Sequence, residues 1–366
     1  MPRASSSKPP NAPSKRSTVP SALWRRKRHI EREQPMPDDR DEIDWLGPAE
    51  FIFQTPVRAR KRKQGPDAMP KRRRAGVAGR VLRVVSRKPE VMVKITGSAR
   101  GFKRLKEHLA YITRNGKLTA ERENGELIAG SCNVRSLAKD WWSDDHKGRG
   151  GRRRDTVNLI LSMPVGTDRG AVADAARAFA RSEFAGRFDY LMAVHEDTDH
   201  PHVHLTVKTH GLQGQYLDPR KGDLQAWREV FAAALRKRGV KAEATPRRSR
   251  GVVRKGQRQA IRHMDARRGS RVTRWKLEQA IKAAQSGTSI GEGQPWIAAG
   301  RERQRNMKRA WATLAAAFEG SGQVAAAVEI KRFIADMPPA RTEREALLER
   351  ARELLAEQAK SQGRKK

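Results

Sequence analysis

Four of the nine histidines in this sequence lie within ten residues of one another, in the segment LMAVHEDTDHPHVHLTVK. They are His195, His200, His202 and His204. Alternate residues of a β-strand point to the same face, so His202 and His204 would share the polar face of a strand whose other face is apolar. If the chain turns back through His200, His195 at the end of the preceding strand lies opposite His202, with Cβ atoms about 5 Å apart. The spacing therefore predicts a cluster of three imidazoles, with His200 directed elsewhere.

Three imidazoles arranged in this way are suited to one divalent metal ion. Ligation by three histidines leaves coordination positions open, as a catalytic metal site requires. The alternative is a set of solvated surface histidines, the more common meaning of an isolated His-x-His pair, and the register-matched His195 argues against it. Asp197 could orient one of these imidazoles by a hydrogen bond, or it could only shape the turn.

The second candidate is Tyr111, one of three tyrosines in the chain. A helix predicted over residues 102–113 carries one apolar stripe, and at about 100° per residue Tyr111 lies well off that stripe. A phenol has a pKa of about 10, so it attacks a phosphate only when a metal polarises the phosphate or a base takes the proton. Arg114 and Lys117 follow closely and are suited to contact phosphates. From spacing alone, an exposed structural tyrosine is the more common interpretation.

The charge balance indicates a polyanionic partner. Lysine and arginine number 78 against 41 acidic residues, a formal net charge of +37. Basic residues that neutralise phosphates release condensed counterions, so nucleic acid is the expected partner, ahead of a membrane surface or an acidic protein. The single cysteine, Cys132, excludes a disulfide framework or a thiolate zinc cluster within one chain and favours a reducing compartment. Because the sequence contains no apolar run of about 18 residues and no apolar signal core, we expect a soluble, cytoplasmic protein.

The composition divides the chain into three regions. Residues 1–88 are rich in Pro, Ser, Lys and Arg and predict a basic, mostly disordered arm, in which residues 41–53 either fold on a partner or form an incidental apolar patch. Residues 89–245 alternate short strands and helices and are expected to form the catalytic domain. Residues 246–366 are basic and predict a helical region.

Several predicted strands join in hairpins, whereas helices separate the others. The predicted strands cover residues 91–96, 118–121, 126–128, 156–163, 189–196 and 203–209. The predicted helices cover residues 102–113, 134–144, 170–184, 224–238, 251–264 and 272–285, followed by two or three helices between residues 297 and 358 that are interrupted at Pro338-Pro339. This pattern predicts an α+β fold with a central antiparallel or mixed sheet covered by helices.

Together these segments resemble the conjugative relaxases, or mobilisation nucleases, of the HUH endonuclease superfamily, and most closely the branch with the T-DNA border endonucleases. AYITRNGKL resembles the family's tyrosine motif, HEDTDHPHVHLTVK its histidine motif, and LILSMPVGTD a central motif in which a serine approaches DNA. The resemblance covers about residues 91–256. It implies a relaxase-like fold, Tyr111 as the DNA-linking nucleophile, and DNA contact by Ser162. The metal ligands it implies are His195, His202 and His204.

The resemblance also implies an activity and partners. The family nicks one strand of single-stranded or supercoiled DNA at a transfer origin, with Mg²⁺ or Mn²⁺, and retains the 5′ end as a phosphotyrosyl intermediate. A type IV secretion coupling protein and accessory relaxosome proteins would be partners, in the bacterial cytoplasm. Two departures matter: the family's tyrosine usually lies near the N-terminus, and Lys208, for which we expect a DNA contact, stands where Asn is often found. Neither argument assigns the base for Tyr111, for which Asp197 is the candidate.

Three alternatives stay open from the sequence. Another HUH enzyme, a rolling-circle replication initiator or a transposase, would share the chemistry and differ in its target DNA. A metal phosphodiesterase would use water as the nucleophile and leave Tyr111 structural. A basic DNA-packaging or accessory protein would not need the histidines at all.

Overall fold

The structure is a computed structural model that describes residues 46–53, 76–146, 153–252, 256–257, 259–287 and 295–363. These residues belong to one of two compact units, Asp39–Lys366; the other unit, Met1–Asp38, lies outside the described residues. Most of the expected basic arm, including Trp45, therefore also lies outside them.

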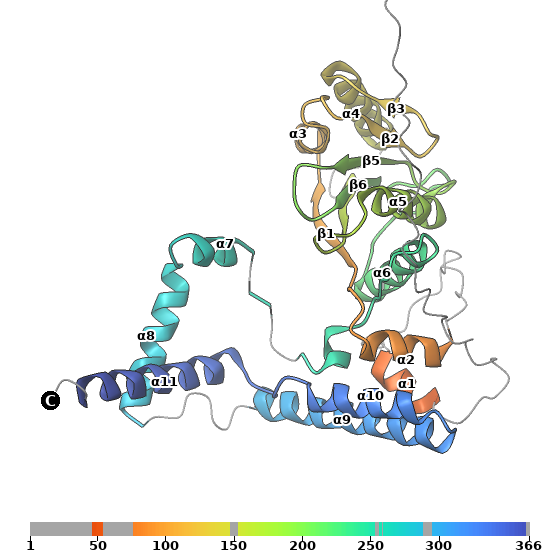
Figure 1. Ribbon diagram of the computed structural model, residues 1–366. Helices are drawn as coiled ribbons and strands as arrows, with labels where there is room; N and C mark the ends of the chain where they lie inside the picture. The colour runs from red at the N-terminus through yellow and green to blue at the C-terminus, as the bar shows by residue number, and fades with distance from the viewer. Residues whose placement is uncertain are drawn as a thin grey trace, which may run out of the picture. The chain divides into compact units, whose positions relative to one another are not determined.

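A six-stranded antiparallel sheet forms the centre of the described part of residues 89–245, the sheet region (Figure 1). Across the sheet the strands are β1 (Met92–Ala99), β4 (Thr156–Ser162), β6 (His202–Lys208), β5 (Tyr190–His195), β2 (Ala120–Arg122) and β3 (Leu127–Ile128). Each pair of neighbours is antiparallel. The predicted α+β fold with a central sheet is thereby confirmed.

Helices alternate with single strands or strand pairs along this part of the chain. The helices of this region are α3 (Phe102–Ile112), α4 (Ser131–His146), α5 (Arg169–Phe184) and α6 (Lys221–Arg236). Further along lie α7 (Gln259–Arg267), α8 (Arg271–Gln285), α9 (Pro295–Gly320), α10 (Val324–Ala335) and α11 (Glu343–Gly363). The helix expected over residues 251–264 begins later, at Gln259, because the chain first makes a 3-10 turn, η1 (Arg247–Arg250), which Gly251 ends at a φ of 71°.

The two faces of the sheet are covered by different helices (Figure 1). Strict alternation puts Leu159, Leu161 and Leu205 on one face, where α5 and α6 cover them with Phe179, Trp227 and other apolar side chains. On the opposite face, α3 and α4 cover the β5–β2–β3 side of the sheet. The buried stripe Leu105, Leu109 and Ile112 of α3 packs there with residues of β5 such as Ala193.

A second hydrophobic core contains buried side chains from early and late segments of the described chain. Helices α1 (Leu46–Phe53) and α2 (Val77–Val85) share it with α9 and α10. Ile52 and Trp311 are fully buried in it, and the rings of Phe53 and Trp311 meet edge to face. These two stretches of the expected arm are therefore helices packed within the chain, and the partner of residues 46–53 is the chain's own α9.

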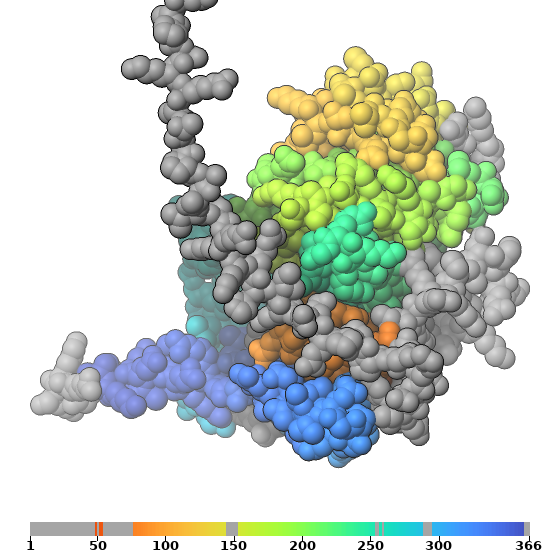
Figure 2. All heavy atoms as spheres, turned by 45° about the vertical axis from the view of Figure 1, so that its right-hand side comes forward, coloured from red at the N-terminus to blue at the C-terminus, as the bar shows by residue number. Residues whose placement is uncertain are grey.

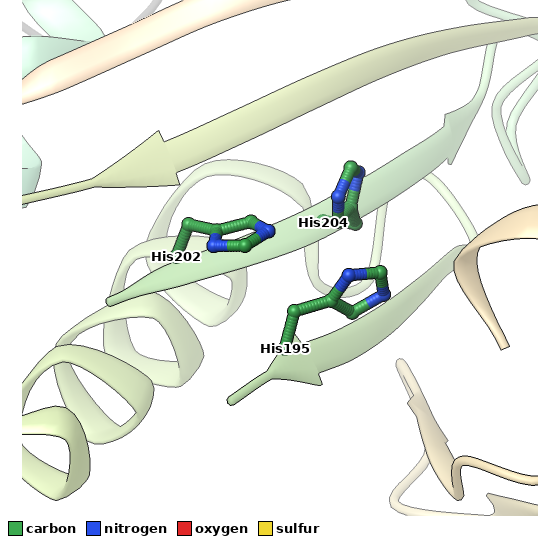
Figure 3. Close-up of side chains that lie close together, drawn as sticks. All are labelled: His195, His202 and His204. Atoms are coloured by element: carbon green, nitrogen blue, oxygen red, sulfur yellow. The ribbon is translucent and has the colours of Figure 1, made fainter. Parts of the chain in front are cut away.

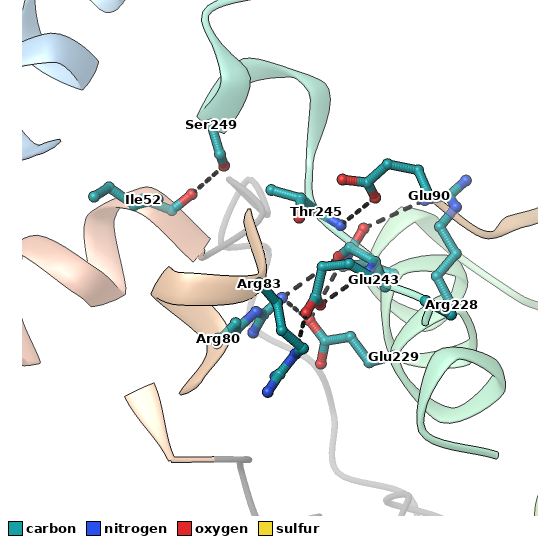
Figure 4. Close-up of polar contacts among 12 residues, drawn as sticks. Ile52, Arg80, Arg83, Glu90, Arg228, Glu229, Glu243, Thr245 and Ser249 are labelled. Atoms are coloured by element: carbon teal, nitrogen blue, oxygen red, sulfur yellow. Dashed lines mark hydrogen bonds and ion pairs between the residues drawn. The ribbon is translucent and has the colours of Figure 1, made fainter. Parts of the chain in front are cut away.

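Helix α2 also contacts the sheet region through ion pairs (Figure 4). Arg83 pairs with Glu243 at 2.6 Å and Arg80 pairs with Glu229 of α6 at 2.7 Å. The Glu243 side chain is only 4% exposed, so removal of its basic partner would leave a buried carboxylate without this ion pair. In Figure 2 this helix, in orange, lies between α6 in green and the blue helices α9 and α10, in agreement with these contacts.

Helix α11 packs along α8, with Leu348 and Ala351 buried on α11 and Ala280 on α8. Within the described parts of the chain, no helix combines the length and the apolar character that a membrane span requires.

Candidate active site

The predicted histidine cluster is present in the structure. Strands β5 and β6 pair with His195 directly opposite His202, the register expected from the sequence. The three ring centroids of His195, His202 and His204 lie 4.4–5.3 Å apart. One ring nitrogen from each lies within 4.8 Å of the others, and Figure 3 shows the imidazoles turned toward a common space. The three side chains are therefore close enough to hold one metal ion.

Backbone carbonyls set the orientation of two of these rings. His195 Nε2 donates to the carbonyl oxygen of Ile112 at 2.7 Å, and His202 Nδ1 donates to the carbonyl oxygen of His200 at 3.1 Å. A neutral imidazole that donates through one nitrogen has its lone pair on the other, so each ring keeps a ligand atom. His200 contributes this carbonyl oxygen, and its imidazole is not part of the cluster.

Burial favours the neutral form of two of the three imidazoles, His195 and His204. His195 and His204 are 3% and 6% exposed. Burial, reinforced by the neighbouring His195 and His202, lowers the pKa of His204 to about 3. Burial is also the largest cause that lowers the pKa of His195. Neutral imidazoles are the form that binds metal, so these two rings are prepared for a cation at neutral pH.

Tyr111 lies beside the cluster, on the last turn of α3. Its side chain is 64% exposed, whereas Leu109 and Ile112 of the same helix are fully buried. The Tyr111 ring centroid is 5.9 Å from that of His204, with the rings nearly perpendicular. The bond from His195 to the Ile112 carbonyl joins the cluster to the residue that follows Tyr111. The phenol is thus exposed and adjacent to the three imidazoles.

The turn after α3 brings Arg114 and Asp197 together. Arg114 and Asn115 adopt positive φ values of 53° and 56°, and the Arg114 guanidinium donates to an Asp197 carboxylate oxygen. The other Asp197 carboxylate oxygen lies 3.9 Å from His195 Nδ1. The hydrogen bond from Arg114 lowers the pKa of Asp197. Among the described residues Asp197 forms no hydrogen bond with Tyr111; it lies between Arg114 and the cluster.

Part of this region is similar to a known protein family. Residues 111–240 match the family model described as "Relaxase: MobA/VirD2-like, nuclease domain", a stretch that begins at Tyr111 and includes all three clustered histidines. This match supports a relaxase-like nuclease domain over these residues.

Known relatives agree with this assignment. The "T-DNA border endonuclease VirD2" of Rhizobium radiobacter is 28% identical over 209 residues, which cover 52% of this chain and 48% of the relative. The protein of the same description from Agrobacterium fabrum is 26% identical over 184 residues, 45% of this chain and 41% of the relative. The chain thus matches less than half the length of these relatives. A solved structure described as "Molecular Basis of Vancomycin Resistance Transfer in Staphylococcus aureus" is 16% identical, with a TM-score of 0.29 over 43% of this chain and 98% of that chain.

The other residues predicted to contact DNA lie in different places relative to the histidines. Ser162 pairs with His202 across β4 and β6, where it is buried, and its hydroxyl donates to the Met163 carbonyl oxygen at 3.3 Å. Lys117 is exposed in the turn after α3. Lys208 ends β6, roughly 20 Å along the strand from His202 at about 3.3 Å per residue. Ser162 is therefore local to the site, whereas Lys208 is remote.

A groove beside Tyr111 adds residues that sequence reasoning missed. It has a volume of about 430 Å³ and is lined by His204, Tyr111, Thr96, Gly97, Ser98, Ala99, Arg104, Glu107, His108, Asn158 and Ile160. His108 Nε2 lies 2.9 Å from the Thr206 hydroxyl, and its ring centroid is 6.5 Å from that of Tyr111. The available signal was the spacing of His108 and Tyr111, which places both on one face of α3. The groove, which polar and apolar residues line together, reaches the phenol.

Proposed function

We propose that this chain is a DNA relaxase, in which the Tyr111 hydroxyl attacks a phosphodiester and nicks one DNA strand. The observation that carries the proposal is the exposed phenol beside three convergent imidazoles. The other two tyrosines are less suited: Tyr190 is buried, which raises its pKa to about 12, and the hydroxyl of Tyr216 lies 3.1 Å from the Arg154 amide, which donates to it. The relatives, named as T-DNA border endonucleases, support a nuclease that acts on DNA.

The donor set of the cluster fits a divalent metal. His195, His202 and His204 would hold it: backbone acceptors orient His195 and His202, and burial favours the neutral form of His195 and His204. A bound Mg²⁺ or Mn²⁺ would polarise the scissile phosphate and offset the charge that develops on its oxygens. Oxygen-preferring Mg²⁺ is usually bound with several waters, and three imidazoles leave coordination positions for such ligands.

The proposed reaction is a transesterification. A bond forms between the Tyr111 hydroxyl oxygen and phosphorus, the bond from phosphorus to the 3′ oxygen breaks, and the 3′ end leaves as a hydroxyl. The 5′ end stays on the protein as a phosphotyrosine, which keeps the phosphodiester energy for rejoining.

The phenol proton needs an acceptor, and Asp197 is the candidate. Its pairing with Arg114 weakens it as a base. Arg114 can pair with Asp197 or with a DNA phosphate, so substrate that draws Arg114 away would restore the ordinary basicity of the carboxylate. In the absence of DNA, Asp197 would instead hold Arg114 and steady the His195 imidazole.

DNA would lie along the groove and the turn after α3. Arg114 and Lys117 would contact phosphates near the phenol, Ser162 would contact the strand near His202, and Lys208 would contact DNA further along the sheet. We further propose, on the likeness to relatives, that the substrate is single-stranded or supercoiled transfer-origin DNA. A type IV secretion coupling protein and relaxosome proteins would then be partners in conjugative transfer.

Tyr111→Phe tests the proposal directly. Supercoiled DNA carrying the transfer origin is incubated with Mg²⁺, and denaturing electrophoresis measures nicking and the covalent protein–DNA species. We expect the wild type to form a 5′-linked adduct, and Tyr111→Phe to form none and to nick more than about a thousandfold more slowly, because the nucleophile is gone.

Tyr216→Phe is the matched control, since it removes a hydroxyl from the same domain and should retain nicking. Nicking by Tyr111→Phe at the wild-type rate would instead show that water attacks. Unchanged DNA processing by His202→Ala with His204→Ala would show that the cluster has no part in it.

A further inference from the structure

The α7–α8 corner, residues 259–275, has an unusual concentration of positive charge. Between Arg262 and Trp275 the sequence contains five arginines and one carboxylate, Asp265. Arg267, Arg268, Arg271 and Arg274 are exposed. In the part of the chain that the structure describes, none of these four guanidinium groups forms an ion pair. Their charge is therefore free to act on a partner.

Hydrogen bonds hold this corner in one shape. Ser270 caps α8 by accepting a hydrogen bond from the Thr273 amide at 3.0 Å. Asp265 accepts from the Ser270 amide at 2.6 Å and from the Thr273 hydroxyl at 2.8 Å, and these bonds lower its pKa. The only carboxylate of residues 262–275 is thus committed to the turn. The arginines consequently project from a defined scaffold.

Helix α8 has two different faces. One face packs on α11, where Ala280 is buried and Lys276 pairs with Glu343 at 2.7 Å. The other face exposes Trp275, whose side chain is 60% exposed, one helical turn after Arg271. Water does not stabilise the apolar face of an exposed indole. An indole among arginines is characteristic of a surface that binds single-stranded nucleic acid, where the ring stacks on an unpaired base and the arginines contact phosphates.

We infer that the α7–α8 corner is a second DNA-binding surface, which holds single-stranded DNA outside the groove beside Tyr111. Trp275 stacks on a base, and Arg267, Arg268, Arg271 and Arg274 contact the backbone. A membrane surface fits less well, because a helix that binds one presents a continuous apolar face, and that face of α8 is packed on α11. This surface needs no cleavage to bind, so its test is independent of the chemistry at Tyr111.

The test is the affinity of the full chain for a fluorescein-labelled thirty-residue oligothymidylate, measured by anisotropy at several salt concentrations. Trp275→Ala should weaken binding at least about fivefold, and Trp275→Phe should restore most of the loss, because phenylalanine also stacks. Arg271→Gln with Arg274→Gln should reduce the slope of log affinity against log salt by about 1.4. Oligothymidylate that contains 4-thiothymidine should cross-link to the peptide with Trp275.

Matched controls separate this surface from general charge and exposure. Trp296→Ala removes another exposed tryptophan, and Arg303→Gln with Arg344→Gln removes two exposed arginines elsewhere. Equal effects of the corner variants and their controls, or no cross-link at Trp275, would overturn the inference. So would variants that bind oligothymidylate normally but lose binding to vesicles of phosphatidylserine and phosphatidylcholine.

Discussion

The pKa values of individual imidazoles in this domain depend on their surroundings. His108 lies under the groove with Thr206 as a hydrogen-bonding neighbour, and burial lowers its pKa to about 4. His204 is affected in the same direction, with a pKa of about 3. Both side chains are therefore neutral at pH 7, and protonation of either is coupled to unfolding in the metal-free protein.

The coupling at His108 predicts a specific pH dependence. Its ordinary pKa is 6.5, so the stability associated with the neutral ring is fully present above pH 6.5 and is lost as the pH falls toward 4. At pH 5 the loss should be about 2 kcal/mol. In His108→Asn, which cannot take up this proton, the free energy of unfolding in urea should fall less between pH 7.5 and 5, by about that amount. The same decrease in both proteins would contradict this account of His108.

At the scale of elements, the junction between α3 and α4 positions the nucleophile. The turn after α3 runs through Arg114, Asn115 and Gly116, all with positive φ. A Cβ on Gly116 would lie 2.3 Å from the Gly130 carbonyl carbon and the Ser131 nitrogen, at the start of α4. Because Tyr111 and Ile112 end α3, this close approach fixes where the phenol meets the cluster.

Gly116→Ala should therefore damage both stability and nicking. The backbone of Gly130 and Ser131 cannot yield as a flexible side chain would, so we expect a loss of about 3 kcal/mol or more in the free energy of unfolding, and slower nicking. Gly125→Ala is the matched control: its φ is +85°, but nothing lies within 4 Å of the added Cβ. It should cost about 1 kcal/mol and leave nicking intact. Comparable losses for the two variants would show that contact with α4 is unimportant.

At the scale of the whole molecule, the second core joins segments more than two hundred residues apart in sequence. Helices α1 and α2 precede the sheet region in the sequence and α9 and α10 follow it. The apolar side chains of these four helices nevertheless form one cluster. Trp311 of α9 also donates from its indole nitrogen to the Ser249 carbonyl oxygen at 2.7 Å, and the Ser249 hydroxyl lies 2.5 Å from the Ile52 carbonyl oxygen, to which it donates (Figure 4). Helices that precede the sheet region in the sequence and helices that follow it thus form one helical unit.

Neighbouring substitutions in α1 test this packing. Ile52→Ala should lower the free energy of unfolding by about 2–4 kcal/mol, because Ile52 is fully buried and the surrounding core cannot close the cavity completely. Phe51→Ala, at the exposed neighbouring position, should cost about 1 kcal/mol or less. Thermal unfolding of the two variants supplies the comparison, and equal effects would mean that α1 does not pack against α9 in solution.

Local periodicity was sufficient to predict the histidine cluster. A strand has a side-chain period of two and the turn between β5 and β6 is short, so the pairing of His195 with His202 follows from sequence distance alone. The position of Tyr111 off the apolar stripe of α3 follows in the same way from the helical period. Both predictions concern residues whose relation is set within a single element or hairpin.

Only the tertiary structure showed which of these elements meet. The approach of α3 to β6, which brings His108 to Thr206 and Tyr111 to His204, depends on packing between residues nearly one hundred positions apart. The same is true of Ile52 and Trp311, because nothing in the short apolar stretch of residues 46–53 specifies a partner in α9. Burial against a distant segment depends on the shape and volume of the whole core, whereas the alternation of side chains along one element depends only on its backbone geometry.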